Sequence, residues 1–496
     1  MVKTAIQGGW IVGWTTNGHQ ILDGGTVVFE NDRIVFVGFP SDQECPKAER
    51  TINAQGMLVS PGLINLHCIA NLDLQVLRMD MKVGEGSGYC KPRSWVTNPD
   101  APHILSDEDF RVSSRFCVAT LLKGGSTTFA AVTTGATKRW EDPSVEPYAL
   151  AEASEEMGAR AWISHLYREA CDYTNGDGKR GEIWDRQKGQ AGLDNAIKLI
   201  KNLQAKGNPL VTGFLFPSRT DKCSDELLKE TIHQSKVLGD VHVRSHFSEH
   251  LQEFRDFRAK EPSHTMVEWL RDVGFLGPQV CLTHAIYIGG HSATGESPRD
   301  DLQILAQSGT SICHCPVVFA RGGSALETFS RYVNAGINMG IGTDTFPPDL
   351  LEEMRVGALI NKVIDRQRSV GSARDFYNAA TIGGARALGR EDLGKLVVGA
   401  TSDISIFNLS GLSSGPIDDP IRSLVHFAGR RECHTVIVGG EIVVDDGQIL
   451  GVDEERLSLQ AGRTWTRYMK GLVDWDYAGR ATDIVFPTAF PIIGNK

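Results

Sequence analysis

Several histidines and carboxylates follow short apolar runs in the middle of the chain, where their side chains could meet. Imidazole and carboxylate groups together suit Zn, Fe or related divalent ions. A single histidine in such a place is more often a hydrogen-bonded structural residue, but three histidines and an aspartate in equivalent places are a rare coincidence. We therefore predict a metal site whose ligands are His67, His246, His284 and Asp344.

Eight apolar runs alternate with helical stretches and would position these residues. The predicted strands cover residues 58–67, 127–132, 161–164, 210–216, 241–245, 280–283, 311–315 and 337–342. Alternating strands and helices predict a parallel sheet, and eight units of this size fit a (β/α)8 TIM barrel within the α/β class. A doubly wound sheet is the alternative, but no glycine-rich phosphate loop follows the first strand. In a barrel, reactive side chains lie at the carboxyl ends of the strands.

Both ends of the chain are rich in short β-runs, so they could pair into one small domain that the barrel interrupts. We expect the amino-terminal part of this domain over residues 1–58, the barrel over 59–390 and the carboxy-terminal part over 391–452. Residues 453–496 would form a carboxy-terminal arm. Its prolines favour a wrapping or interface segment over a strand within a sheet.

Composition excludes several classes of protein. The 496 residues are 41% hydrophobic and 23% charged, which is ordinary for a globular chain. The 51 Lys and Arg against 61 Asp and Glu give a net charge of −10, which disfavours binding to nucleic acid or to an anionic membrane. No basic segment with a following apolar run opens the sequence, and no apolar stretch reaches the length of a membrane span, so we expect neither a signal peptide nor a transmembrane helix. Ten scattered cysteines without a CxxC pair indicate free thiols, and we expect a cytoplasmic protein.

Seven segments together resemble the amidohydrolase superfamily, and in particular its cyclic deaminase and chlorohydrolase-like branch. They are residues 59–67, 125–128, 245–249, 282–284, 313–316, 342–344 and 379–389. The resemblance covers residues 1–450 and implies a metal-bearing (β/α)8 barrel with a small β-sandwich built from both chain ends. It also implies a homo-oligomer, either a dimer or a tetramer.

One departure from the family concerns the end of the first barrel strand. The family usually has His-x-His there, whereas this chain has His67, Cys68 and Ile69. Asn71 has the same parity along the strand, so its amide oxygen could reach the metal; alternatively, Asn71 caps a loop. The molinate and phenylurea hydrolases of the family are similarly irregular. Carried over from the family, the ligands would be His67, His246 and Asp344, and His284 could move inward to fill the gap.

The resemblance also bears on the number of ions. Binuclear members of the superfamily carry a lysine after the fourth strand, and residues 214–219 contain none. We therefore expect one divalent ion per chain, with Zn favoured and Fe, Mn or Co compatible.

The resemblance and the chemistry of a bound metal assign catalytic roles. A catalytic zinc lowers the pKa of bound water from about 15.7 toward about 7. Asp344 would be both a ligand and the base that takes the water's proton, and His284 would orient the water or stabilise the developing oxyanion. Glu249 would carry the proton to the leaving nitrogen, although a glutamate at a helix start could simply complement the helix dipole.

Substrate contacts are less sharply indicated. Arg219 follows the fourth strand and could face a polar substrate, while Trp95 and Phe346 could form an apolar wall. Each of them could equally be part of the scaffold.

These expectations lead to three functional hypotheses. The first is a metal-dependent hydrolase that cleaves a C–N bond of an amide, urea, carbamate or thiocarbamate in a small aromatic or heterocyclic substrate; the altered motif at Ile69 favours it. The second is a hydrolytic deaminase of an amino-heterocycle. The third is a non-catalytic relative that retains the barrel as a scaffold.

Overall fold

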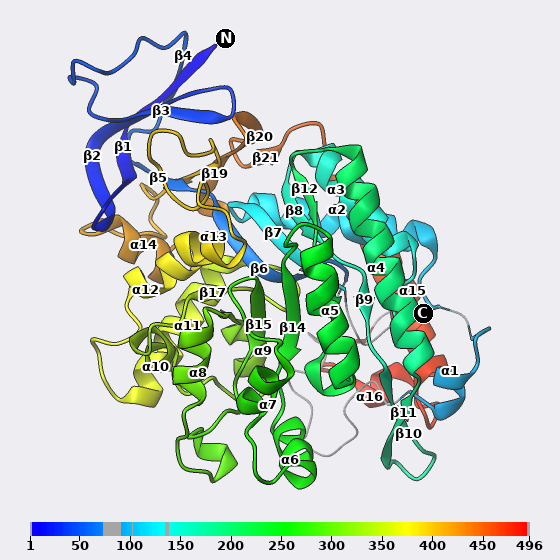
Figure 1. The fold of residues 1–496 in the computed structure, drawn as a ribbon. Coiled ribbons are helices and arrows are strands. Elements are labelled where there is room, and N and C mark those ends of the chain that lie inside the picture. Colours follow the sequence, from blue (N-terminus) through cyan, green and yellow to red (C-terminus); the bar gives the residue numbers. More distant parts are fainter. Residues whose placement is uncertain (1, 73–90, 102, 134–137, 494–496) are drawn as a thin grey trace.

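Both ends of the chain build one β-sheet, seen at the top of Figure 1. The computed structural model describes residues 2–72, 91–101, 103–133 and 138–493. Within these residues the sheet has nine strands in the order β21-β20-β19-β18-β5-β1-β2-β3, with β4 paired to β1. The strands are β1 (Lys3–Thr15), β2 (Gly18–Glu30), β3 (Arg33–Gly38), β4 (Arg50–Asn53), β5 (Met57–Pro61), β18 (Ile404–Asn408), β19 (Cys433–Val438), β20 (Glu441–Asp445) and β21 (Gln448–Ile449).

Strands from both chain ends thus share one continuous hydrogen-bonded sheet, and the division of the chain into a barrel and a small β-sandwich domain stays a prediction. Strand β5 from the amino-terminal part pairs antiparallel with β18 from the carboxy-terminal part, so that Pro61 lies opposite Ile404. Apolar side chains of both parts, including Val59 and Ile406, share one core. The strand predicted over residues 58–67 is therefore two strands, because β5 belongs to this sheet and the next strand to another.

Parallel strands form the interior of the molecule. Two sheets have four strands each, in the orders β12-β8-β7-β6 and β14-β15-β16-β17, and β13 pairs with β9. These strands are β6 (Leu63–Ile69), β7 (Ser126–Val132), β8 (Arg160–Ile163), β9 (Leu166–Tyr167), β12 (Val211–Gly213), β13 (Phe216–Pro217), β14 (Val243–Phe247), β15 (Val280–His284), β16 (Ser311–His314) and β17 (Met339–Ile341). All side chains of β6 and β7 are buried, as expected for strands covered on both faces.

Backbone contacts join the two four-stranded sheets on both sides. On one side, Leu215 after β12 forms a bridge with Val243 of β14. On the other, the amides of Thr343 and Asp344 beyond β17 donate to the carbonyl of His67 in β6, at 2.9 and 2.8 Å. Each of the eight strands predicted for the barrel overlaps a strand of these sheets.

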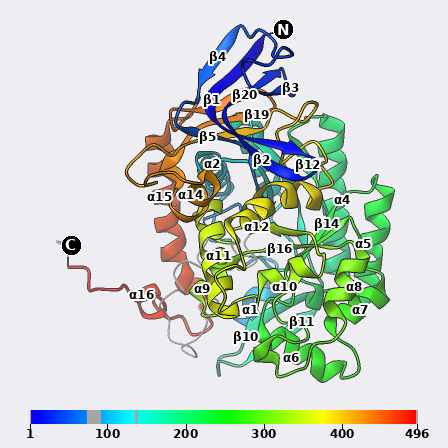
Figure 2. The same cartoon turned by 90° about the vertical axis from the view of Figure 1, so that its left-hand side faces the viewer.

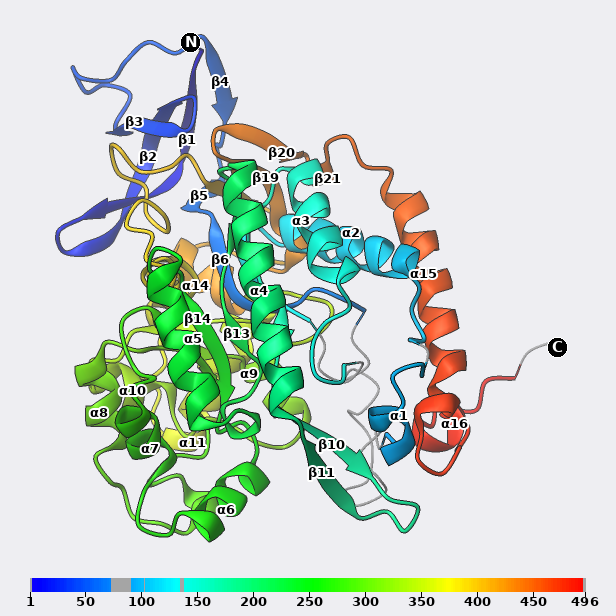
Figure 3. The same cartoon turned by 45° about the vertical axis from the view of Figure 1, so that its right-hand side comes forward.

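Helices follow the parallel strands and cover them from outside (Figures 1 and 3). They are α2 (Asp107–Lys123), α3 (Val145–Met157), α4 (Arg186–Lys206), α5 (Asp225–Val237), α6 (Leu251–Lys260), α7 (Met266–Val273), α8 (Asp301–Ser308), α9 (Pro316–Arg321), α10 (Phe329–Asn334), α11 (Leu350–Asp365), α12 (Ala373–Asn378), α13 (Gly384–Ala387) and α14 (Pro420–His426). Helix α2 begins as its sequence indicates: the Ser106 hydroxyl accepts from the Asp109 amide, and the Asp109 carboxylate accepts from the Ser106 amide.

The carboxy-terminal arm contains α15 (Glu454–Gly471), which packs along α2, and α16 (Thr482–Val485). Between them a 3₁₀ turn over Leu472–Trp475 packs against α1 (Arg93–Thr97). The last described residues, among them Phe490 and Ile492, are exposed and run away from the body of the molecule in Figure 2. No helix in the described part of the chain is both long and apolar enough to cross a bilayer.

Candidate metal centre

Three histidines and an aspartate converge at the carboxyl ends of four parallel strands. One ligand atom from each of His67, His246, His284 and Asp344 lies within 4.8 Å of the others. The Nε2 atom of His67 is 3.1 Å from Nε2 of His246 and 3.2 Å from the Asp344 carboxylate. Nε2 of His284 is 3.6 Å from the same carboxylate. The predicted ligand set is therefore assembled from residues that are distant in the sequence.

The register between β14 and β15 offsets His246 and His284 by one residue along the paired strands. His246 of β14 lies opposite Thr283 of β15, and Phe247 lies opposite His284. Because side chains alternate along a strand, Thr283 shares the face of His246 and His284 would point the other way. His284 has φ of 81° and Ala285 has φ of 49°, so the backbone leaves the strand conformation there. This turn brings the His284 ring to 5.3 Å from that of His246, nearly parallel to it.

Asp344 also has an unusual backbone, with φ of 46°. Non-glycine residues in the left-handed region carry a cost of about 1–3 kcal/mol and are concentrated at functional sites. Two of the four candidate ligands thus occupy conformations that regular strands avoid.

Hydrogen bonds to the far side of two imidazoles orient them toward the centre. The Thr283 hydroxyl is 3.2 Å from Nδ1 of His67, and Nδ1 of His246 bonds to the carbonyl of Ser218. A carbonyl can only accept, so His246 carries its proton on Nδ1 and presents the lone pair of Nε2 toward the centre. Such outer contacts typically fix the ring orientation of metal-bound histidines.

The electrostatics of the cluster suit a cation. Burial is the main cause that lowers the pKa of His67, His246 and His284, so all three rings are neutral at pH 7. Neither ring nitrogen of buried His284 has a hydrogen-bond partner among the described residues. Buried polar atoms are rarely left in this state unless a water or an ion satisfies them. Neutral imidazoles beside a carboxylate form a donor set that fits one divalent ion.

Glu249 follows β14 by two residues and lies beside this cluster. Burial alone would raise its pKa, but His250, at 3.2 Å, together with His284 and Arg219 holds the pKa of Glu249 well below its usual range. The charge of Glu249 in turn acts on the titration of all three histidines. The predicted proton carrier is therefore an ionised carboxylate within electrostatic reach of the candidate ligands.

Asn71 has partners other than the histidine cluster. Its amide nitrogen donates to Glu146 at 3.1 Å, and its amide oxygen accepts from the backbone of Leu72 at 2.7 Å. These contacts fit the loop-capping alternative, and the ligand role of Asn71 stays a prediction. His284 lies with the other three donor atoms. Ile69 is buried where the family has its second histidine.

Arg219, which we expected to contact substrate, forms ion pairs with acidic side chains. It contacts Asp221 at 2.9 Å, Glu253 at 3.2 Å and Glu249 at 3.6 Å. The structure therefore places Arg219 beside the site, but its guanidinium is occupied by protein carboxylates.

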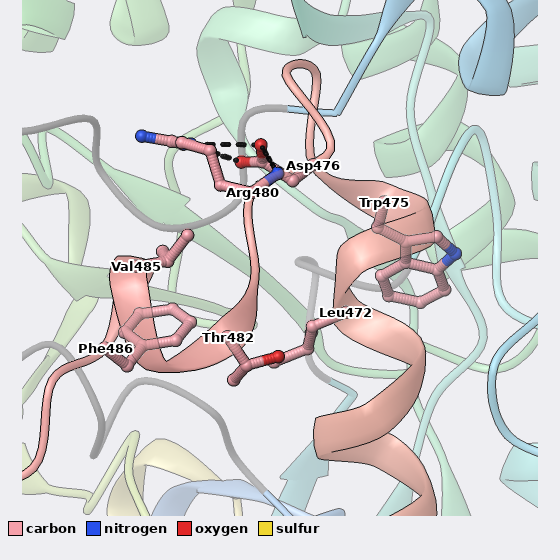
Figure 4. Close-up of a pocket in the computed structure, with 7 residues that line it drawn as sticks. All are labelled: Leu472, Trp475, Asp476, Arg480, Thr482, Val485 and Phe486. Carbon is pink, nitrogen blue, oxygen red and sulfur yellow. Dashed lines mark hydrogen bonds and ion pairs between the residues drawn. The ribbon is translucent and has the colours of Figure 1, made fainter.

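Trp95 and Phe346 have packing partners. The Trp95 ring lies 5.3 Å from Trp475 of the arm, in the wall of a groove of about 400 Å³. Figure 4 shows the neighbouring part of the arm, where Trp475 lines a smaller pocket beside the bonded pair of Asp476 and Arg480. Phe346 is half-buried with its ring 5.7 Å from Phe116 of α2. Neither contact supports a substrate role, and both predictions remain untested. Residues 73–90 of the long segment that contains Trp95 lie outside the described residues.

Three contributors to the site were not anticipated from the sequence: Thr283, the Ser218 carbonyl and Glu253. Thr283 precedes a predicted ligand, and Glu253 stands four residues after Glu249, which is one helical turn. Those spacings could have indicated Thr283 and Glu253 from the sequence. The role of the Ser218 carbonyl has no signal in residue type, because every residue carries a carbonyl.

Comparison with known proteins agrees with this architecture. The chain is 29% identical over 460 residues to 5-methylthioadenosine/S-adenosylhomocysteine deaminase of Desulforudis audaxviator, covering 90% of this chain and 96% of the relative. It is 26% identical to 5'-deoxyadenosine deaminase of Methanosarcina mazei, covering 88% and 92%.

Solved structures share the fold. An atrazine chlorohydrolase from Arthrobacter aurescens TC1 complexed with zinc superposes with a TM-score of 0.75 at 23% identity, covering 93% of this chain and 99% of that one. An adenosine deaminase from Xanthomonas campestris with bound zinc gives 0.74 at 21% identity, covering 94% and 98%. The sequence profile of the amidohydrolase family matches residues 58–443, which include all four candidate ligands and Glu249. The chain therefore belongs to the amidohydrolase family.

Proposed function

We propose that this chain is a metal-dependent hydrolytic deaminase of a small amino-substituted heterocycle, with adenine nucleosides as the first class to test. Membership of the amidohydrolase family makes the chain a hydrolase that acts on carbon–nitrogen bonds. The observation that carries the proposal is the convergence of four donor atoms next to the ionised Glu249, with both ring nitrogens of His284 buried and without a hydrogen-bond partner among the described residues. The two deaminases named above, each similar over most of this chain, favour a deaminase over the amide or urea hydrolase that Ile69 had suggested.

The residues of the centre have distinct tasks in this reaction. His67, His246, His284 and Asp344 would hold the ion, which supplies Lewis acidity and lowers the pKa of water at the site toward about 7. The Asp344 carboxylate takes the first proton from that water. The water oxygen would bond to the ring carbon that carries the amino group, and Glu249 would take the second water proton and deliver it to the amino nitrogen. The C–N bond then breaks and ammonia leaves, while Asp344 would return its proton to a ring nitrogen of the oxo product. Proton transfers of this kind typically contribute about 10²–10⁴-fold in rate.

We also propose that the two four-stranded parallel sheets are halves of one (β/α)8 barrel. The bridge between Leu215 and Val243 and the two bonds to the carbonyl of His67 support this, since they join the sheets on both sides. A barrel explains why the four candidate ligands meet: they follow the first, fifth, sixth and eighth strands, whose carboxyl ends surround one axis.

A second candidate is the hydrolysis of an amide, urea or carbamate. Ile69 favours it, because the family's second histidine is absent and the first-strand contribution is reduced to His67. The non-catalytic scaffold has less support, since the other ligands and Glu249 are assembled.

The two candidates release different products. Metal-loaded protein is to be incubated with adenine nucleosides and other amino-heterocycles, and in parallel with aryl amides, ureas and carbamates. Ammonia release from the first set that falls about 10²–10⁴-fold in Glu249→Gln is the expected result. Amine release from the second set without ammonia from the first would replace the deaminase by the second candidate. If the metal-loaded protein hydrolyses neither set, the non-catalytic scaffold becomes the favoured hypothesis.

A further inference from the structure

A single arginine connects three carboxylates next to the metal centre. Nε of Arg219 donates to Asp221 at 2.9 Å, Nη2 lies 3.2 Å from Glu253, and Nη1 lies 3.6 Å from Glu249. The Arg219 side chain is 19% exposed and that of Glu253 only 2%. An arginine fork suits such multiple contacts because its donors have a fixed planar geometry. Exposed ion pairs contribute little, but this network is largely shielded from water.

Glu253 adds a second connection, to the backbone of the turn that carries Glu249. One carboxylate oxygen accepts from the amide of Ser248 at 2.9 Å and the other from the amide of Glu249 at 2.9 Å. Ser248 has φ of 47°, a left-handed conformation that needs support from its surroundings. The turn between β14 and α6 is therefore held from the first helical turn of α6 itself.

The segment that carries Arg219 also touches a metal ligand. Arg219 forms a bridge with His246, and the preceding residue, Ser218, accepts from both the backbone amide and Nδ1 of His246. Two consecutive residues after β13 thus contact a candidate ligand and the candidate proton carrier.

We propose that Arg219 and Glu253 are positioning residues that hold the Glu249 carboxylate and its turn in place beside the metal centre. This rests on the proposed function, in which Glu249 moves the proton. Without the Arg219 charge, Glu249, Glu253 and Asp221 repel one another, and the Glu249 side chain moves away from the centre. In Glu253→Gln one carboxylate oxygen becomes an NH2 group, so one of the amides of Ser248 and Glu249 loses its acceptor.

Four variants test this on the intact, metal-loaded chain: Arg219→Gln, Arg219→Lys, Glu253→Gln and the control Arg258→Gln. Arg258 lies on α6 and pairs with Glu296 at 2.7 Å, with a side chain 22% exposed, so its loss removes a comparable ion pair from the same helix. The measurements are bound metal, kcat and KM for the best substrate of the product screen, and hydrogen–deuterium exchange of the peptide over residues 246–250.

For Arg219→Gln we expect kcat to fall roughly 10- to 100-fold, the loss typical of a misplaced catalytic group, with KM and metal content unchanged. Arg219→Lys restores part of kcat because it returns the charge without the fork. Glu253→Gln lowers kcat and speeds amide exchange in the 246–250 peptide. Arg258→Gln changes none of these quantities.

Other outcomes overturn the proposal. A rise in KM at constant kcat in Arg219→Gln would make Arg219 a substrate contact, and loss of metal would make it a support of His246. Unchanged amide exchange in Glu253→Gln would mean that its carboxylate does not hold the turn. If wild-type protein hydrolyses no substrate, the proposed function fails, whereas the exchange and metal measurements still decide whether Arg219 and Glu253 hold this turn.

Discussion

At the scale of single residues, the site depends on left-handed backbone conformations as much as on side-chain type. His284 reaches the cluster because residues 284 and 285 leave the strand conformation, and Asp344 shares the left-handed region. These two residues complete a donor set that Ile69 would otherwise leave short. His284, at the end of β15, thus lies where it could make up for the missing family histidine, and a ligand role for Asn71 stays a prediction.

Loss of the Asp344 carboxylate should empty the centre. Wild-type protein purified without added metal, or after incubation with divalent ions and desalting, should hold about one ion per chain by elemental analysis, as expected for a single site. Asp344→Ala removes the only charged donor among the four and should hold far less. A wild-type chain that holds no ion under either condition would contradict a metal centre at these residues.

His314 should make stability depend on pH. Burial lowers its pKa to about 3, whereas in the unfolded chain the ring has its ordinary value near 6.5. Between these values the unfolded chain binds more protons, so stability falls as pH falls through this window. From pH 7 to 5, metal-free wild type should lose about 2 kcal/mol more free energy of unfolding than His314→Gln. Denaturant titrations at both values measure this, and equal losses in the two proteins would refute it.

The residue types of the ligands could be predicted from the sequence because each follows an apolar run that had to be a buried strand. The partners of Asn71 and Trp95 could not. Asn71 bonds to Glu146, and Trp95 packs on Trp475, nearly 400 positions further along the chain. Such contacts depend on how distant elements meet, which no local pattern encodes.

At the scale of elements, the close approach of β6 and β17 brings His67 and Asp344 together. A Cβ atom at Gly342 would lie 2.6 Å from Cβ and 2.7 Å from the backbone nitrogen of His67, and 2.9 Å from Sγ of Cys313. Only a residue without a side chain fits between these groups. The missing side chain at Gly342 therefore allows the close approach of β6 and β17 next to the site.

Gly342→Ala should separate β6 from β17 and displace His67. We expect a loss of about 1–3 kcal/mol in the free energy of unfolding, as for other overpacked cores, and a lower metal content. The matched control is Gly462→Ala on the exposed side of α15, where an added Cβ meets nothing within 4 Å. That change should leave metal content unaltered and should not destabilise the helix. Equal behaviour of the two variants would show that the β6–β17 contact tolerates a side chain.

The order of strands and helices was predictable because hydrophobic runs and capping residues are local signals. Helix α2, for example, begins after the capping residue Ser106 and ends at Gly124. The assignment of the first strand to a sheet could not be predicted in this way. Residues 58–67 read as one apolar run, but the chain changes sheets near Gly62, where a Cβ would collide with Thr127. Which sheet a buried run joins depends on partners from both ends of the chain.

At the scale of the whole molecule, one buried ion pair connects the parallel strands to the sheet of the two chain ends. Arg160 of β8 donates to both oxygens of Asp403, at 2.8 and 3.0 Å, and Asp403 also accepts from the amide of Gly439 at 2.8 Å. Both side chains are almost fully buried. The homo-oligomer implied by the family resemblance stays a prediction at this scale.

Arg160→Met should weaken the whole molecule. It leaves the Asp403 carboxylate buried without its cation, which typically costs about 3–5 kcal/mol in the free energy of unfolding. Arg422 pairs with Asp419 in water, so the control Arg422→Met should change stability little. Urea denaturation compares both variants with wild type. Equal stabilities of Arg160→Met and Arg422→Met would mean that this pair does not tie the two parts together.

The pairing of β5 with β18 has a consequence for synthesis on the ribosome. Pro61 cannot pair with Ile404 until Ile404 has been synthesised. At about 5–20 residues per second, the intervening chain takes tens of seconds to emerge. During that delay the outer edge of the amino-terminal β-strands has unpaired amides and carbonyls, the kind of edge that recruits other chains. The nascent protein therefore passes through an obligatory aggregation-prone interval, and its yield on overexpression should rise with slower translation or with chaperones that cover strand edges.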